Sequence, residues 1–137
     1  EKYLDKYFET IKRSLNVNGA AAIQGITIRD DLFERYRSSE DFIQKYIFPG
    51  GFLPSLGFMK SLIKKNNLNL LKVNSYPDDY AKTLATWREN FLKVWSNIAP
   101  LGFDETFKRM WEFYLSYCEA GFKSKNIDLI QFSMSNK

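Results

Sequence analysis

Residues 20–28 read AAAIQGITI, a run of small and branched apolar side chains with a single amide inside it. A continuous apolar run of this length, preceded by turn residues at positions 16–19, predicts a strand that is buried on both faces. An amphipathic helix is expected over residues 4–15, directly before the turn. A helix, a short glycine turn and a buried strand in this order are typical of a parallel α/β sheet. Ligands bind such sheets at the carboxyl ends of the strands, where Gln24, Gly25 and Ile26 are expected to lie.

The rest of the chain continues as predicted helices and strands, so the fold class is α/β. Apolar spacing predicts helices over residues 42–47, 55–66, 78–94 and 104–122, and strands over residues 68–74 and 127–134. We expect the last of these strands at or near an edge of the sheet. Residues 29–39 are strongly charged without a clear period and predict a surface connection. Residues 48–54 combine bulky apolar groups with prolines and glycines, and this segment is expected to pack against other parts of the chain.

The composition indicates one globular domain and excludes several kinds of chemistry. The chain has 137 residues, 45% of them hydrophobic, which is enough for a core of its own. The absence of histidine excludes His-based triads, His proton shuttles and imidazole metal ligands. The single cysteine, Cys118, excludes an internal disulfide and favours the cytosol. A formal net charge of +4 is too small to predict nucleic-acid binding, although it permits weak attraction to an anionic surface.

Two polar side chains in apolar surroundings need hydrogen-bond partners. Gln24 lies in the predicted buried strand, where an amide without a partner costs about 1–3 kcal/mol. Tyr80 begins an apolar helical stripe, and its hydroxyl also requires a partner. Pairing with nearby backbone and a role at a ligand site are both open on these grounds. Cys118 lies on another apolar stripe without a histidine to activate it, so by itself it is interpreted as a core thiol.

Several motifs in order resemble the cyclopropane-fatty-acyl-phospholipid synthases and the related mycolic acid cyclopropane synthases. The residues that carry the resemblance are YIFPGGFLPS at 46–55, YAKTL at 80–84 with Trp87, and Tyr114-Leu115 with Cys118. Residues 3–8 and 19–28 are similar to the region of the fifth strand in the same family. The resemblance covers essentially the whole chain.

The resemblance implies a Rossmann-like methyltransferase fold. Residues 1–137 would be a single C-terminal portion of this domain, comprising the helix before strand five, strands five to seven and inserted helices. The family's S-adenosylmethionine site lies in the other half, so no cofactor-binding residue is assigned here. The family's catalytic cysteine and glutamate would also lie upstream of Glu1, which makes Cys118 a different cysteine. The chain alone is therefore expected to be inactive.

The resemblance also implies roles for particular residues. In the family, methyl transfer to a cis double bond is completed by a bound bicarbonate that acts as the base. The positions that hold this ion match Gln24, the backbone amide of Ile26 and the hydroxyl of Tyr80. Many cyclopropane synthases carry histidine in place of Gln24, so the product, a ring or a methyl branch, stays open. An apolar channel for the acyl chain would be lined by residues at five matching positions: Phe48, Leu53, Leu84, Tyr114 and Cys118.

The expected function is thus part of an S-adenosylmethionine-dependent methyltransferase that alkylates unsaturated acyl chains of phospholipid. The implied partners are these acyl chains and, peripherally, the inner membrane surface of a bacterial cell, with self-association through the exposed edge of the partial sheet. Nucleic acid is not an expected partner. A small-amine methyltransferase and a non-catalytic interaction module are the alternatives.

Overall fold

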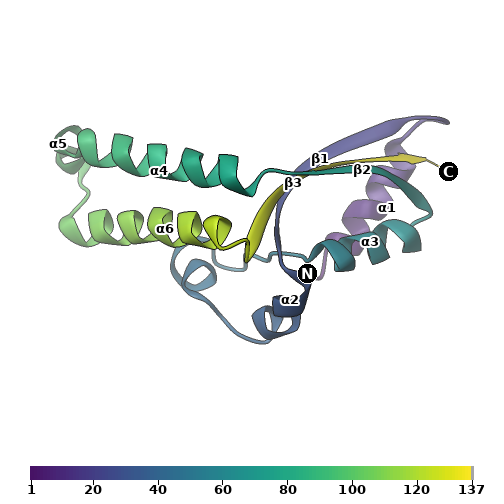
Figure 1. Cartoon of the computed structure of the whole chain (residues 1–137), viewed down its shortest axis with the longest axis horizontal. Coiled ribbons are helices and arrows are strands. Elements are labelled where there is room, and N and C mark those ends of the chain that lie inside the picture. Colours follow the sequence, from purple (N-terminus) through teal and green to yellow (C-terminus); the bar gives the residue numbers. More distant parts are fainter. Residues whose placement is uncertain (137) are drawn as a thin grey trace. The chain divides into compact units, whose positions relative to one another are not determined.

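The structure, a computed structural model, describes residues 1–136. The chain forms two compact units. Unit 1 comprises Glu1–Tyr76 and the chain from Ile127 on, and unit 2 comprises Pro77–Asn126. The elements of unit 1, labelled in Figure 1, are α1 (Leu4–Ser14), β1 (Ala20–Ile28), α2 (Asp30–Arg37), the π-helix η1 (Ile43–Ile47), α3 (Leu56–Lys65), β2 (Leu68–Ser75) and β3 (Ile127–Asn136). Those of unit 2 are α4 (Pro77–Lys93), α5 (Trp95–Ile98), the 3-10 helix η2 (Ala99–Leu101) and α6 (Glu105–Lys123).

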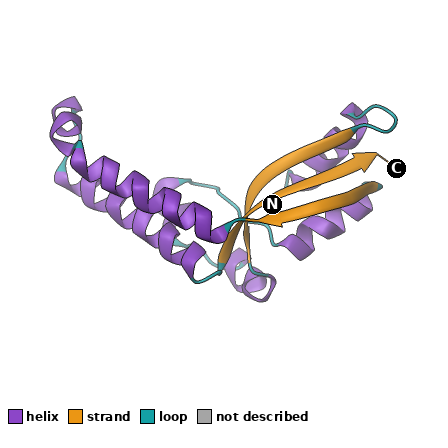
Figure 2. Cartoon of the chain, turned by 45° about the horizontal axis from the view of Figure 1, so that its top comes forward, coloured by secondary structure: helices purple, strands orange, loops and turns teal. Residues whose placement is uncertain are grey.

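Unit 1 is built on a three-stranded sheet in the order β1-β3-β2 (Figure 2). Both outer strands pair antiparallel with β3, so β1 and β2 run in the same direction on either side of it. The prediction that residues 127–134 form a strand is confirmed, and so is its place at or near an edge: β3 is not itself an outer strand but lies directly beside the outer strand β2. The described strand ladders of β1 and β2 are both antiparallel, whereas a parallel sheet was expected; a parallel bridge joins only Ile28 to Ser55 among the described residues.

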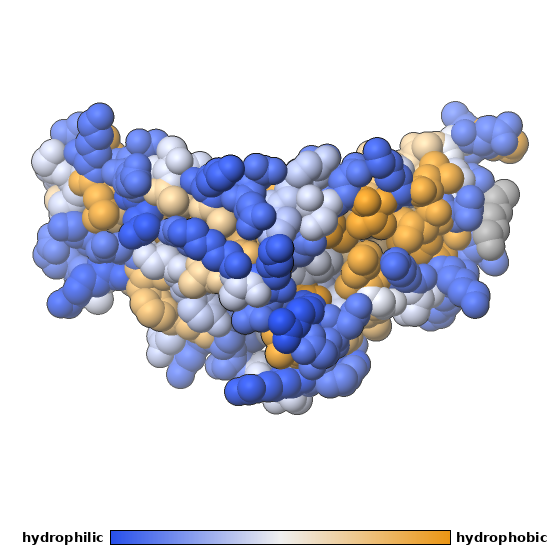
Figure 3. Space-filling model, viewed as in Figure 1, coloured by the Kyte–Doolittle hydropathy of each residue, from blue (hydrophilic) through white to orange (hydrophobic). Residues whose placement is uncertain are grey.

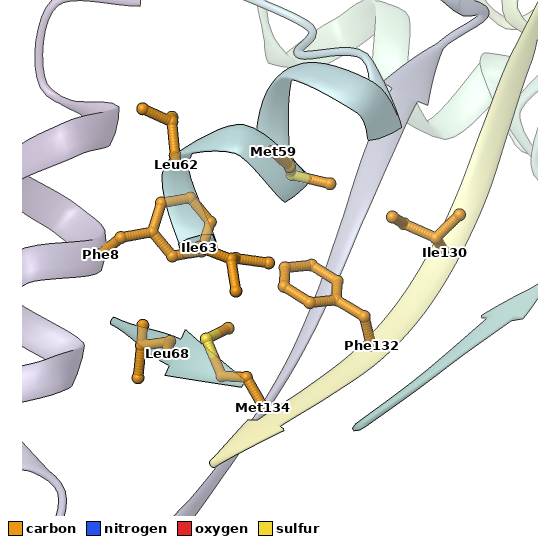
Figure 4. Close-up of a cluster of buried hydrophobic side chains, with 8 residues drawn as sticks. All are labelled: Phe8, Met59, Leu62, Ile63, Leu68, Ile130, Phe132 and Met134. Atoms are coloured by element: carbon orange, nitrogen blue, oxygen red, sulfur yellow. The ribbon is translucent and has the colours of Figure 1, made fainter. Parts of the chain in front are cut away.

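One face of this sheet is covered by α1 and α3. Eight buried side chains point toward one another there (Figure 4): Phe8, Met59, Leu62, Ile63, Leu68, Ile130, Phe132 and Met134. The expectation that β1 is buried on both faces is wrong. Ala21 and Ile23 pack against this core, whereas Ala20, Ala22 and Gln24 alternate with them and are exposed. Alternation along a strand sends successive side chains to opposite faces, so β1 is covered on one face only.

The charged segment after β1 is a helix rather than the expected surface connection. Phe33 of α2 is 5% exposed, and its ring contacts Phe52 and Phe58 at centroid distances of 5.8 and 5.2 Å. A single buried aromatic anchors α2, although the other residues of the segment are mostly charged. This anchoring explains why no apolar period was visible in the sequence.

Unit 2 is a pair of long helices, α4 and α6, which lie side by side in Figures 1 and 2. Ring contacts join them at both ends, Tyr80 to Phe122 at 4.9 Å and Phe91 to Phe107 at 6.4 Å, so the helices run antiparallel. Both helices agree with the sequence prediction within two residues. Among residues 1–136, no helix is long and apolar enough to cross a membrane.

Candidate functional site

Gln24 and Ile26 lie on β1, with Gln24 in the middle of the strand and Ile26 nearer its carboxyl end. Gln24 faces Gln131 of β3, and the amide nitrogen of Gln131 donates to Gln24 Oε1 at 2.9 Å. The predicted need of Gln24 for a partner is met by this neighbouring side chain. Because Gln24 is exposed and its oxygen is occupied, its Nε2 group remains a donor that another group can use.

A residue that the sequence analysis did not single out lies at the carboxyl ends of both outer strands. Asp128 pairs in register with buried Thr27 of β1, and its Oδ2 accepts a hydrogen bond from Ser75 Oγ, at the end of β2, at 2.6 Å. Its second oxygen, Oδ1, is buried without a hydrogen-bond partner among the described residues. A buried acceptor in this state is uncommon, which makes Asp128 a candidate for contact with a ligand. The signal in the sequence that could have identified Asp128 is its charge, which interrupts the apolar pattern of residues 127–134.

Phe48 and Leu53 belong to the apolar loop before α3. Gly50 has a φ of +78°, and a Cβ on Gly51 would come within 2.9 Å of the carbonyl oxygen of Phe48, so both glycines are required for this turn. The Leu53 amide donates to the hydroxyl of Tyr36 at 3.0 Å, and Phe52 packs in the aromatic cluster of α2. The loop is therefore packed, as predicted. Leu53 is half-buried, and Phe48 is exposed.

Unit 2 brings four of the predicted residues into one helix pair. Tyr80 and Leu84 lie one turn apart on α4, and Tyr114 and Cys118 lie one turn apart on α6. Leu84 is 2% exposed, and the other three are half-buried. The ring of Tyr80 contacts Phe122 and Trp87 edge to face, at 4.9 and 5.9 Å.

The phenols of this group stay protonated far above neutral pH. Burial raises the pKa of Tyr114 to about 12, and the charges of Cys118 and Tyr80 add to the effect. Burial, followed by the charge of Cys118, also raises the pKa of Tyr80. The two hydroxyls and the thiol are thus half-buried and close enough to affect one another. Neutral phenols can donate hydrogen bonds to an anion there, as the predicted role of Tyr80 requires.

A buried charge joins the same two helices. Glu119 of α6 is 7% exposed and accepts hydrogen bonds from Arg88 of α4, at 2.9 Å, and from Lys123. These hydrogen bonds hold the pKa of Glu119 below its usual value, the bond from Lys123 most of all, although burial opposes them. Beside Glu119 lies an open hollow of about 340 Å³, whose lining contains none of the predicted site residues: Asp78, Ala81, Lys82, Ala85, Glu119 and Lys123.

The predicted site residues thus fall into two sets. Gln24, Ile26, Phe48 and Leu53 lie in unit 1, and Tyr80, Leu84, Tyr114 and Cys118 lie in unit 2. The second set shares one helix pair. In the first set, β1 holds Gln24 and Ile26, and the loop before α3 holds Phe48 and Leu53. The assignment of an anion site and of an acyl channel to these residues stays a prediction.

The fold matches solved methyltransferase structures. It aligns with the crystal structure of mycolic acid cyclopropane synthase CmaA1 complexed with SAH and CTAB at a TM-score of 0.88 and 26% sequence identity, covering 99% of this chain and 50% of that one. The three strands and the helices around them accordingly match part of the Rossmann-like fold of the S-adenosylmethionine-dependent methyltransferases, and the expected fold class is confirmed.

The family is more specific than this class. Residues 1–132 match the family described as Mycolic acid cyclopropane synthetase, and the chain belongs to that family. It is 40% identical over 130 residues to tuberculostearic acid methyltransferase UfaA1 of Mycobacterium tuberculosis (strain ATCC 25618 / H37Rv), covering 94% of this chain and 30% of the relative. It is 32% identical over 137 residues to the cyclopropane-fatty-acyl-phospholipid synthase of Escherichia coli (strain K12), covering 98% of this chain and 34% of the relative. The chain therefore spans about a third of the length of these curated relatives.

Proposed function

We propose that this chain supplies the lipid-facing part of an S-adenosylmethionine-dependent methyltransferase that alkylates the double bond of an acyl chain in phospholipid. The observation that carries the proposal is the α4–α6 pair, which holds two protonated phenols and a thiol in an apolar environment beside Leu84. An acyl chain requires apolar walls, and the reaction requires a site from which water and strong nucleophiles are excluded.

The polar groups of the chain fit an anionic base. Bound S-adenosylmethionine supplies the methyl group to one carbon of the double bond, and positive charge then develops on the acyl chain. The amide nitrogen of Gln24 and the hydroxyl of Tyr80 are neutral donors, which suits a bicarbonate ion that accepts the departing proton. The aromatic faces of Tyr80 and Trp87 stabilise positive charge near the reacting carbon.

The identity of the substrate is supported by the relatives. One is named as a methyltransferase for tuberculostearic acid, and the other as a synthase of cyclopropane-fatty-acyl phospholipid. This favours a lipid over the small-amine alternative. We place the reaction at the cytoplasmic face of the membrane, where unsaturated phospholipids are accessible to a peripheral enzyme.

A fusion protein tests the function directly. In the E. coli enzyme, the third that matches this chain is replaced by residues 1–137, and the fusion is expressed in cells that lack their own synthase. We expect alkylated fatty acids by gas chromatography and mass spectrometry, which also distinguishes a ring from a branch. A fusion that binds S-adenosylmethionine but leaves all acyl chains and added small amines unmodified would support the non-catalytic alternative. The 137-residue chain alone should transfer no methyl group from labelled S-adenosylmethionine to phospholipid vesicles.

Two variants of the fusion test the anion site. Tyr80→Phe should lower turnover at least tenfold with unchanged S-adenosylmethionine affinity, because it removes only a donor to the base. Tyr117→Phe is the matched control, since the side chain of Tyr117 on α6 is 43% exposed, and the turnover of this variant should stay within twofold of the parent fusion. Equal turnover of the two variants would refute the role of Tyr80.

A further inference from the structure

The end of unit 2 that joins α4 to α6 exposes large apolar side chains. We call residues 94–103, with α5 and η2, the tip segment. Leu101 is 75% exposed, and Val94 and Phe103 are each 42% exposed. Figure 3 shows apolar atoms at this end of the unit among hydrophilic ones. The two connections to unit 1, at Pro77 and Asn126, lie at the opposite end of the helix pair.

The exposure of the tip segment is fixed by its backbone. Gly102 has a φ of +99° and its amide donates to the Ala99 carbonyl at 3.1 Å, which closes the turn of η2 that contains Leu101. Asp104 then caps α6 by accepting from the Phe107 amide at 2.8 Å. Hydrogen bonds therefore fix the backbone on both sides of Leu101, and the Leu101 side chain points into solvent.

Near the tip segment, the acidic side chains have hydrogen-bond partners within the chain, whereas two basic side chains form no ion pair in the part of the chain that the structure describes. Both acids are engaged, Asp104 in the helix cap and Glu105 with the indole of Trp95 at 3.1 Å. The ammonium of Lys108 lies 5.4 Å from the centre of the Trp95 ring. Lys108 also forms an ion pair with Glu105, at 3.7 Å. Lys93 and Arg109 are exposed, and neither takes part in the ion pairs found in residues 1–136. Free cations thus flank an apolar tip.

We propose that the tip segment inserts into the interface of an anionic phospholipid bilayer. Leucine and phenylalanine reach the acyl boundary, tryptophan prefers the headgroup level, and lysine and arginine bind anionic headgroups. A second copy of the chain fits less well. The surface area of three protruding side chains is far below the roughly 1,200 Å² that a stable protein–protein interface buries. In a dimer formed through this segment, the cations of the two copies would also face and repel each other.

Vesicle binding by the 137-residue chain tests this inference, which rests on the proposed function only for the choice of lipid. Flotation is measured with phosphatidylglycerol–phosphatidylethanolamine vesicles and with phosphatidylcholine vesicles. We expect binding to the anionic vesicles to be at least tenfold stronger and to weaken with salt. Leu101→Glu should reduce it at least fivefold. Val17→Glu is the matched control, because Val17 is 86% exposed in unit 1 and its variant has the same net charge; binding should stay within twofold.

Three results would overturn the inference: no vesicle binding, equal losses in the two variants, or a dimer that Leu101→Glu dissociates while vesicle binding is unchanged. Circular dichroism spectra of both variants check that each is folded, so that a loss of binding cannot be caused by unfolding. The assay needs no turnover, so its failure is distinct from a failure of the fusion protein to alkylate lipid. With detergent-dispersed substrate, Leu101→Glu in the fusion should leave turnover unchanged.

Discussion

The two units of the molecule are stabilised in different ways. Unit 1 encloses eight apolar side chains between a sheet and two helices, and this cluster contains no charged or hydroxyl group. Unit 2 has two long helices whose contact includes tyrosine hydroxyls, a thiol and the carboxylate of Glu119. Apolar burial is the main source of stability, whereas buried polar groups contribute less and are often retained for function. Unit 1 is therefore expected to depend mainly on apolar burial for its stability, and unit 2 to depend in part on buried polar and charged groups.

Their charges differ as well. Unit 1 contains thirteen basic and nine acidic residues, and unit 2 contains seven of each. The whole net charge of +4 therefore belongs to unit 1. Attraction to anionic lipid by unit 2 depends on which of its charges are unpaired, as at the tip segment, rather than on its net charge.

The largest effect is expected in the core of unit 1. Phe8→Ala should lower the free energy of unfolding by about 3–5 kcal/mol, because Phe8 is 1% exposed and its removal leaves a cavity. Urea denaturation followed by circular dichroism measures the change. Val17→Ala, at an exposed position of the same unit, should change it by less than about 0.5 kcal/mol. A loss below about 1 kcal/mol for Phe8→Ala would contradict the dependence of unit 1 on apolar burial.

A smaller loss is expected from the buried charge of unit 2. Glu119→Ala leaves Arg88 without its carboxylate and should cost about 1–3 kcal/mol, less than for a fully buried pair because Arg88 reaches solvent. The double variant Glu119→Leu with Arg88→Met should recover most of this loss. Glu89→Ala, an exposed acid on α4, is the control and should be neutral. If the double variant is no better than Glu119→Ala, the pair matters for packing rather than for charge.

The same carboxylate predicts an acid dependence of stability. The pKa of Glu119 is lowered in the folded state, so its contribution is present above the ordinary pKa of about 4.3 and is lost as the pH falls through the folded value. The wild type should lose stability over this range more steeply than Glu119→Gln. Thermal melts between pH 3 and pH 7 measure the difference, and parallel curves would show that other carboxylates dominate.

The smallest effect is a spectroscopic one. Tyr114 should ionise near pH 12, about two units above an exposed tyrosine, so the absorbance of phenolate at 295 nm should show a late component. Because the folded pKa is raised, the stability that Tyr114 contributes is intact below about pH 10 and declines above it. Tyr114→Phe should remove the late component. If it persists, another tyrosine is the buried one.

The sequence predicted the helices and strands better than their arrangement. The stripe that contains Tyr80 and Leu84 defined α4, since a long helix shows its period clearly. The sequence placed β3 at or near an edge but did not show that it has a strand on each side, because alternation, here Ile130, Gln131 and Phe132, reports one covered face and not the number of neighbouring strands. In β1 the alternation itself was hidden, because alanines occupy both faces at 20–22.

The candidate site was predictable only in part. The motifs gave Tyr80, Leu84, Tyr114 and Cys118 through family resemblance, and the structure brings these four into one helix pair. Asp128 was missed because its importance arises from long-range neighbours, Thr27 and Ser75, which the sequence separates from it by 101 and 53 residues. Contacts of that kind depend on strand register, which local patterns do not fix.

The central position of β3 also constrains how the chain folds during synthesis. β1 and β2 have no strand between them until residues 127–136 leave the ribosome, so the sheet cannot close early. Unit 2 is completed before β3 and contains the contacts of its own helix pair, which lets it form first. The contact of Tyr80 with Phe122 then holds the two ends of this insertion together. Closing a flexible loop of some fifty residues costs about 3 kcal/mol. A helix pair that has folded before β3 is synthesised would bring the start of β3 close to the end of β2, so that most of this entropic cost would be avoided.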